Sequence, residues 1–366
     1  MTTEQSLAQE LVNTSSVLCG ATVIAVETLA GDMSTRRFSR LVLSHSPVPT
    51  AILMTLSGAK GPVGGGDRGL TQDDTYIEVG DYLRRHEVRV PALYLDARKQ
   101  GCLLVEDIGS VSLLDCAQDS SRMPAALLSE APKDPLLELY AAALRFQKCF
   151  AELPQDSRVV IYQRRTSAEQ RAAQIREFLD HYALPRGLNE ADSQVVQSCM
   201  DAVCARVEQH PTQASHFDFM GANIHVLPSG ELCLIDFQDM CMDSPARDVV
   251  SLLNDRSSDT ALGKDRQRQL LGRYLSEMGG PPDFLQLYDE YLLLWDFRVS
   301  GRFALLADKK GVERYRAWIP STLRRLGRTL VRARKFIPHA DEALSVLARF
   351  SPEVDQGRQD PWTHPV

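Results

Sequence analysis

Hydrophobic and polar positions follow two different periods along the chain, and the period changes near residue 110. Before that point, apolar runs of strand length alternate with turn residues. These runs are 22–29, 37–44, 50–56 and the two halves of a predicted hairpin within 92–109. Residues 71–88 predict a helix that starts at Thr71 as its N-cap. The Gly-rich stretch 57–69 predicts a mobile loop, either a plain connection or a lid that closes on a substrate.

After residue 110, apolar positions recur with a period near 3.6, which predicts helices. The clearest are 134–153, 167–184 and 191–209, and further helical stretches continue to about residue 349. We therefore expect an α+β fold of two lobes, with a boundary near residues 106–110. The expected N-lobe is 1–108, the helical C-lobe is 109–350, and 351–366 is a tail whose last dozen residues are frayed.

One hairpin interrupts the helical region, and polar side chains gather at its open end. Pairing about the turn at 228–230 sets Ile224 against Leu234 and places Asn223 beside Ile235, with Asp236 next along the chain. Asp218 lies in the loop that leads to the same end. Amide and carboxylate oxygens suit Mg²⁺ that is shared with phosphates, and a further Asp can accept a hydroxyl proton.

The spacing of these residues is that of a phosphoryl-transfer site. An Asp, an Asn five residues later, an apolar hairpin and then Asp-Phe is the layout of base and metal ligands in protein kinases. A turn that merely favours Asp and Asn is the structural alternative.

Composition narrows the classes of partner. The 366 residues carry a net charge of −7 and a pI near 5.7, which argues against general nucleic-acid binding. Eight scattered cysteines without a CxxC pair predict reduced thiols rather than disulfides or a zinc site. The first residues do not have the basic start and apolar core of a signal peptide, and no apolar run reaches roughly 18 residues, so we expect neither a signal peptide nor a membrane span. We expect a cytoplasmic protein without a membrane partner; its oligomeric state stays open.

The segment from His216 to Asn223, "HFDFMGAN", together with "IDFQD" at 235–239, resembles the aminoglycoside phosphotransferase and choline kinase-like superfamily. "PARDVVSLLNDR" at 245–256 and the 29–38 segment resemble its branch of anomeric N-acetylmuramate and N-acetylglucosamine kinases, which act in cell-wall sugar recycling. The resemblance covers roughly residues 15–335. It implies a protein kinase-like fold and an ATP- and Mg²⁺-dependent kinase for a small-molecule substrate.

The resemblance also assigns roles to individual residues. Asp218 would be the catalytic base, while Asn223 and Asp236 would bind Mg²⁺. The nucleotide would lie against the turn over the phosphates and the hinge; these residues are Gly31, Asp32, Ser34, Thr35, Arg36, Glu106, Asp107 and Ile108. Supporting roles fall to His216, Asp239 and Asp248, although Asp239 is equally well an exposed charge.

The chain departs from the usual kinase pattern at Met54, where most kinases place a phosphate-binding Lys. The same branch commonly has Met there, so another cation must meet the phosphates. Arg36 and Arg37 are favoured over Lys60 for that role. A pseudokinase-like binding module is the alternative that Met54 supports.

The acceptor is the least determined part of the prediction. The anomeric hydroxyl of an amino sugar is favoured, with an antibiotic aminoglycoside as the rival acceptor. Arg298 and Arg302 on the expected C-lobe wall favour the carboxylate of N-acetylmuramate over a polycation. A second basic run, which we interpret as a solvated helix face rather than an anion site, comprises Arg324, Arg325, Arg328, Arg332, Arg334 and Lys335.

Overall fold

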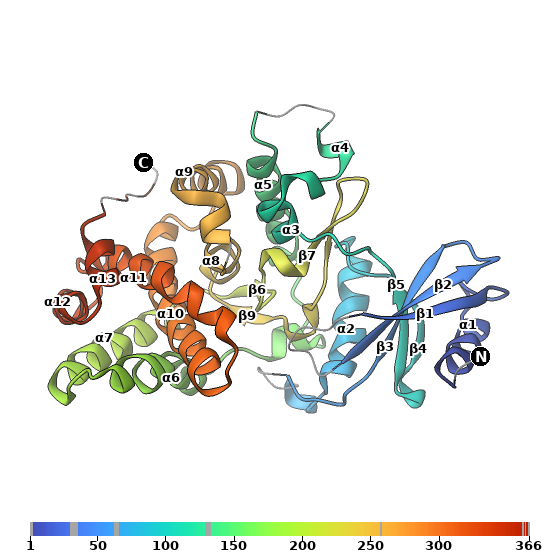
Figure 1. Cartoon of the computed structure of the whole chain (residues 1–366), viewed down its shortest axis with the longest axis horizontal. Helices are drawn as coiled ribbons and strands as arrows, with labels where there is room; N and C mark the ends of the chain where they lie inside the picture. The colour runs from blue at the N-terminus through green and yellow to red at the C-terminus, as the bar shows by residue number, and fades with distance from the viewer. Residues whose placement is uncertain are drawn as a thin grey trace.

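The chain folds into a small lobe built on a sheet and a larger helical lobe (Figure 1). The computed structural model describes residues 3–29, 36–61, 66–128, 133–256, 258–360, 362 and 364. The predicted α+β, two-lobed, kinase-like fold is confirmed. Within the described residues, no helix is long and apolar enough to cross a membrane.

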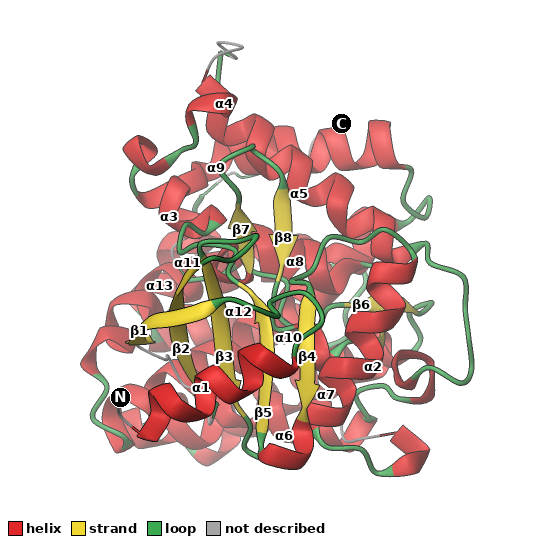
Figure 2. Ribbon diagram, turned by 90° about the vertical axis from the view of Figure 1, so that its right-hand side faces the viewer, coloured by secondary structure: helices red, strands yellow, loops and turns green. Residues whose placement is uncertain are grey.

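The small lobe contains a five-stranded antiparallel sheet in the order β1-β2-β3-β5-β4. Its strands are β1 (Thr22–Leu29), β2 (Arg37–Ser44), β3 (Thr50–Thr55), β4 (Leu93–Ala97) and β5 (Cys102–Glu106). Figure 2 shows α1 (Thr3–Thr14) lying across the strands. The strands predicted before residue 110 therefore form one sheet.

The central strand β3 is apolar and buried from Ala51 to Met54 because helices cover both faces of the sheet. Ala51 and Leu53 join the hydrophobic cluster beneath α1. Ile52 and Met54 join the cluster that contains the buried face of α2 (Gln72–Arg85). Met54 is 3% exposed, so this side chain is part of the core.

The helix α2 begins with a complete capping box, and its N-cap is Thr71, as the sequence predicted. The Thr71 side chain accepts a hydrogen bond from the Asp74 backbone N–H, and the Asp74 carboxylate accepts one from the Thr71 backbone N–H. These bonds fix the start of the helix that faces the larger lobe.

The larger lobe is helical around two short β-pairs. Its helices are α3 (Leu113–Gln118), α4 (Ala125–Leu128), α5 (Pro135–Ala151), α6 (Ala168–Glu177), α7 (Glu190–Glu208), α8 (Ala246–Asn254), α9 (Ser258–Arg273), α10 (Phe284–Ala304), α11 (Ile319–Ala333), α12 (Ala340–Phe350) and α13 (Pro352–Arg358). Its strands are β6 (Gln213–Ser215), β7 (Ile224–Val226), β8 (Leu232–Leu234) and β9 (Cys241–Asp243). β7 pairs with β8, and β6 pairs with β9.

The long helix α10 lies at the centre of this lobe and approaches α6 closely. A Cβ atom added at Gly301 would lie 2.2 Å from the backbone carbonyl carbon of Glu177. Only glycine fits at this contact. The predicted helix 167–184 continues past α6 as a π-helical turn, Phe178–Ala183, whose Phe178 ring packs edge-on against Phe297 of α10.

The prediction of a frayed end is wrong for the start of the last dozen residues. Residues 352–358 form α13, and a Cβ atom added at Gly357 would lie 1.9 Å from the carbonyl oxygen of Arg324 in α11. Beyond it, His364 Nε2 lies 2.8 Å from Asp289 Oδ2. Ser351 caps α13, and the buried Val354 anchors it, which the polar composition of the segment concealed.

The interpretation of the basic run as a solvated helix face is also wrong in part. Arg325 is 5% exposed and contacts Asp296 through both Nε and Nη2, at 3.0 and 2.6 Å. Arg332 makes the same kind of two-atom contact with Asp289. The acids come from α10, about 30 to 40 residues earlier, so the local sequence did not reveal them.

Candidate active site

The predicted catalytic base lies in a tight loop between β6 and β7. Asp218 follows Phe217, whose φ of 79° is in the left-handed region, where a bulky residue needs support from its surroundings. Within the described residues, the Asp218 carboxylate makes no hydrogen bond, whereas its backbone oxygen accepts one from Asn223 Nδ2 at 2.9 Å. The carboxylate is thus available to a substrate while the backbone is held.

The β7–β8 hairpin brings the two predicted metal ligands together with the expected register. Ile224 pairs with Leu234, and the Ile235 N–H donates to the Asn223 carbonyl oxygen at 3.0 Å. Asp236, the next residue, has a φ of 62° and an exposed side chain, one oxygen of which accepts from Gln238 Nε2 at 2.7 Å. Because Asn223 donates through its amide nitrogen, its amide oxygen is left as a ligand beside this carboxylate.

Two buried residues hold the loop in front of Asp218 from behind. Asp248 accepts hydrogen bonds from Ser215 Oγ and from the His216 backbone N–H, at 2.8 and 3.0 Å. The ring of His216 donates through Nε2 to the Ile235 carbonyl oxygen at 2.9 Å, which links the loop to β8. Burial raises the pKa of Asp248, and the contacts with His216 oppose that shift.

Arg247, which replaces the Tyr usual in the branch that the chain resembles, reaches the same loop. Its Nε and Nη2 both donate to the Phe217 carbonyl oxygen, at 3.0 and 2.9 Å. Its Nη1 donates to Asp243 Oδ2 and to the Tyr291 hydroxyl, at 2.6 and 2.7 Å. The guanidinium therefore holds the strained peptide directly before Asp218, a role that sequence reasoning missed.

Asp239 lies under α2 and is buried. Gln72 Nε2 donates to its Oδ2 at 2.6 Å, whereas its Oδ1 has no hydrogen-bond partner among the described residues. Burial raises the pKa of Asp239 to about 6, and the positive charge of Arg164 opposes the shift. In the same segment, the ring of Phe237 stacks on the ring of Tyr76 in α2, with 4.8 Å between the ring centroids. The segment after β8 is thus attached to the small lobe.

The predicted hinge engages its acidic side chains in ion pairs. Glu106 accepts from Arg89 at 2.5 and 2.7 Å, and Asp107 accepts from Arg40 at 2.5 Å. An adenine contact at Glu106, Asp107 or Ile108 would therefore use backbone groups. The other predicted nucleotide residues, Gly31, Asp32, Ser34 and Thr35, lie outside the described residues.

Arg36, one of the cations proposed to replace the missing Lys, pairs with the first turn of α2. Its Nε lies 3.1 Å from Asp73 Oδ1, and both side chains are more than nine-tenths buried. Asp73 Oδ2 also accepts from the Gly58 N–H at 2.7 Å. In kinases a Lys of the third strand pairs with a Glu of the helix that follows it. Here an Arg–Asp pair joins the sheet to α2 instead, and Asp73 had not been singled out.

The predicted acceptor residues differ in their surroundings. Arg302 Nη2 donates to Glu177 Oε1 at 2.6 Å, so it already has a carboxylate partner. Arg298 has no hydrogen bond or ion pair with any described residue, and it lies over the Trp295 ring at 5.6 Å. Burial lowers the pKa of its guanidinium, as does the charge of Arg247, whereas the charge of Asp218 raises it.

Asp255 and Arg256, at the end of α8, also border this region, and we had not predicted a role for them. Asp255 is 4% exposed, and its Oδ2 has no hydrogen-bond partner among the described residues. Burial raises its pKa, while the charge of Arg256 lowers it and that of Asp218 raises it further. Arg256 lies 5.9 Å from the Trp318 ring centroid and 3.3 Å from Met220 Sδ.

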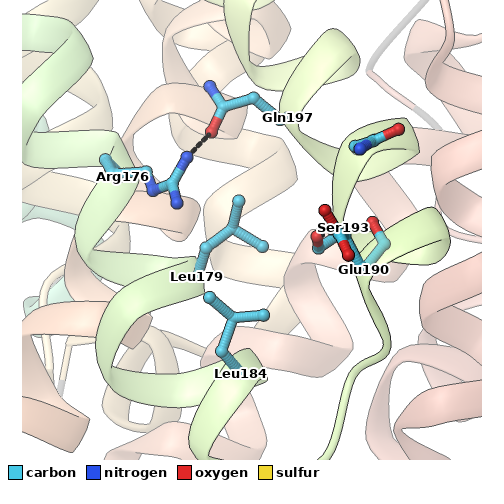
Figure 3. A pocket seen from close by; sticks show the side chains of 7 residues that line it. Arg176, Leu179, Leu184, Glu190, Ser193 and Gln197 are labelled. Atoms are coloured by element: carbon cyan, nitrogen blue, oxygen red, sulfur yellow. Dashed lines mark hydrogen bonds between the residues drawn. The ribbon is translucent and has the colours of Figure 1, made fainter.

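Two cavities lie outside this constellation. One, of about 360 Å³, opens between α6, the π-helical turn and α7, where Arg176 and Gln197 are hydrogen-bonded (Figure 3). The second, of about 370 Å³, borders the hinge at Ile108 and the β7–β8 hairpin at Val226. Neither cavity is lined by Asp218, Asn223 or Asp236. The first cavity therefore gives no information about the chemistry of the site.

Comparison with known proteins agrees with this geometry. A model of the APH phosphotransferase enzyme family matches residues 74–288, more than half of the chain. The chain therefore belongs to this family, and it is a phosphotransferase. No curated protein matches the chain significantly.

Solved structures of the same fold include enzymes with different acceptors. Choline kinase LicA from Streptococcus pneumoniae is 16% identical with a TM-score of 0.52, and the match covers 88% of this chain and 99% of that one. ADP-bound aminoglycoside phosphotransferase APH(2'')-Ib is 12% identical with a TM-score of 0.55, covering 88% and 97%. A choline/ethanolamine kinase family protein from Mesorhizobium loti is 15% identical with a TM-score of 0.51, covering 97% and 99%. At these identities the similarity shows the fold alone.

Proposed function

We propose that the chain is an ATP- and Mg²⁺-dependent small-molecule kinase that transfers the γ-phosphoryl group to a hydroxyl. One observation carries the proposal: the open carboxylate of Asp218 lies at the same hairpin mouth as Asn223 and Asp236. The family match and the nucleotides named with the related structures, such as ADP and AMP, support the donor.

Asp218 would accept the proton of the attacking hydroxyl and orient its oxygen toward the phosphoryl group. Arg247, Asp248 and His216 hold the loop that positions it. Arg36, oriented by Asp73, would be the cation of the small lobe that meets the phosphates. A buried Met54 therefore does not by itself imply a pseudokinase.

The residues present fit a magnesium ion. An amide oxygen and an exposed carboxylate are hard ligands, and two protein ligands suffice when phosphates and water complete the shell. Within the described residues, no cluster of three or more His, Cys, Asp or Glu is arranged to hold a metal. When bound, the ion would spread the charge on the phosphates.

The proposed acceptor is the anomeric hydroxyl of an amino sugar of the N-acetylmuramate or N-acetylglucosamine type. The support is the mixed charge beside the catalytic loop, where Arg256 contacts Met220 and pairs with Asp255, and where α10 carries Arg298. A polycationic aminoglycoside would require mainly acids there. That antibiotic acceptor remains the second candidate because related structures carry aminoglycoside phosphotransferase names.

Phosphorus NMR with Mg-ATP and a panel of amino sugars, aminoglycosides and choline tests the proposal. The wild type should convert ATP to ADP and a sugar phosphate. Asp218→Asn should lower turnover by about 10²–10⁴-fold while nucleotide binding, followed by a thermal shift with Mg-ATP, persists. Asp341→Asn, at an exposed site on α12, is the matched control. Unchanged turnover in Asp218→Asn would exclude Asp218 as the base.

A further inference from the structure

One face of α10 forms a wall beside the catalytic loop. Tyr291, Trp295, Arg298 and Arg302 are spaced by three or four residues and so share that face. Tyr291 fixes its orientation, because its hydroxyl contacts Arg247, which in turn holds the carbonyl of Phe217. The face therefore lies near the hydroxyl that Asp218 would activate.

Arg298 differs from the other arginines around this loop in lacking a partner among the residues that the structure describes. Arg247 contacts Asp243 at 2.6 Å, and Arg302 contacts Glu177 at 2.6 Å. Arg298 has no ion pair or hydrogen bond with any residue that the structure describes, and its side chain is half-buried over the Trp295 ring. Burial lowers the pKa of its guanidinium and the charge of Arg247 lowers it further, whereas Asp218 raises it.

This environment is unfavourable for a guanidinium in the absence of an anion. The charges of Arg247 and Arg302 repel the half-buried guanidinium, and no described acid forms an ion pair with it. The carboxylate of Asp218 is the negative charge that acts on it most strongly, but that group must remain able to accept a proton. A bound anion would satisfy Arg298 without occupying the base.

We propose that Arg298 binds a carboxylate of the acceptor, so that the enzyme favours an acidic sugar over its neutral analogue. A planar guanidinium recognises a carboxylate through two parallel hydrogen bonds. This inference rests on the proposed function and assigns the charge class of its acceptor. The transferring phosphoryl group is the other anion that Arg298 could meet, and the test separates the two.

The test compares N-acetylmuramate, which has a carboxylate, with N-acetylglucosamine, which does not. In Arg298→Met, KM for N-acetylmuramate should rise about tenfold or more, while KM for N-acetylglucosamine and for ATP stay at wild-type values. Arg298→Lys should recover part of the loss, since it keeps the charge but not the paired geometry. Arg349→Met, an exposed arginine on α12, is the matched control.

Equal losses with both sugars, or a raised KM for ATP, would assign Arg298 to the phosphoryl group and overturn the inference. Unchanged kinetics in Arg298→Met would overturn it while leaving the kinase proposal intact. Calorimetric titration supplies a readout besides turnover. N-acetylmuramate should bind the wild type and bind Arg298→Met at least about tenfold more weakly. Equal affinity for both proteins, or no binding to either, overturns the inference whatever the turnover.

Discussion

Arg325 and Arg332 of α11 each face a buried carboxylate of α10, whereas Arg298 of α10 faces the catalytic loop and has no such partner among the described residues. In the sequence these arginines differ little. The structure separates them by what surrounds the guanidinium. A paired, buried arginine joins two helices, while one without a partner beside a reactive carboxylate indicates a ligand. This difference suggests that a ligand-binding role should be assigned to an arginine from its lack of a partner in the protein and not from its charge alone.

The largest effect on stability is expected for a buried arginine that has a carboxylate partner. Arg325→Met leaves Asp296 buried without its cation, which should lower the free energy of unfolding by about 3–5 kcal/mol. Urea unfolding measures it, with the neighbouring Arg324→Met as a control expected within about 0.5 kcal/mol of wild type. Arg325→Met combined with Asp296→Leu should recover much of the loss. If Arg325→Met lowered the free energy of unfolding by less than about 1 kcal/mol, the structural role of the paired arginines in α11 would no longer distinguish them from Arg298.

Asp239 extends the comparison to a buried carboxylate that accepts a hydrogen bond from Gln72 but has no ion pair with a described residue. Its pKa is 3.8 unfolded and about 6 folded, so the folded protein binds more protons between these values. Its contribution to the free energy of unfolding therefore decreases as the pH rises through that window. Asp239→Asn removes the charge, and its stability relative to wild type should increase from pH 4 to 6 by up to about 3 kcal/mol.

Urea unfolding of both proteins at pH 4.5 and 7.5 gives this difference. A stability difference that does not change between the two pH values would contradict the raised pKa of Asp239. Asp341→Asn, which alters an exposed carboxylate, provides the control for a general effect of lost charge.

Arg247 lies between the two cases, because it is paired and also holds the catalytic loop. Arg247→Met should lower kcat about tenfold or more, because the peptide before Asp218 loses the two hydrogen bonds that hold it. Arg247→Lys should recover only part of the loss, because one ammonium cannot reproduce both hydrogen bonds to Phe217.

The matched control is Arg171→Met. Arg171 contacts the same Asp243 at 3.3 Å but does not touch the catalytic loop. This variant should lose stability while kcat stays near the wild-type value. If Arg171→Met and Arg247→Met lowered kcat equally, the effect would belong to Asp243 and not to contact with the loop.

Local patterns predicted the parts of the fold that depend on local forces. The pairing of Ile224 with Leu234 followed from apolar alternation about a three-residue turn, and the Thr71 cap followed from residue type and position. The same hairpin predicted that Asn223 and Asp236 converge, because strand register leaves little freedom at its open end.

The failures share a physical cause, which is that the decisive partner is distant in the sequence. Nothing near Arg325 indicates Asp296, and nothing near Arg302 indicates Glu177. The polar composition of 352–358 concealed a helix that packs on α11 through Val354 and a close approach at Gly357. Side-chain pairing across helices is determined by the tertiary structure and cannot be inferred from the neighbouring sequence.

The close approach at Gly301 has a consequence for how acceptor preference can change over evolution or by design. Because backbone meets backbone there, the axis of α10 is held at a fixed distance from α6. Under the proposed function, substitutions at Trp295 and Arg298 would alter which molecule is accepted without moving that axis. One helix would then diversify substrate choice within an unchanged catalytic frame.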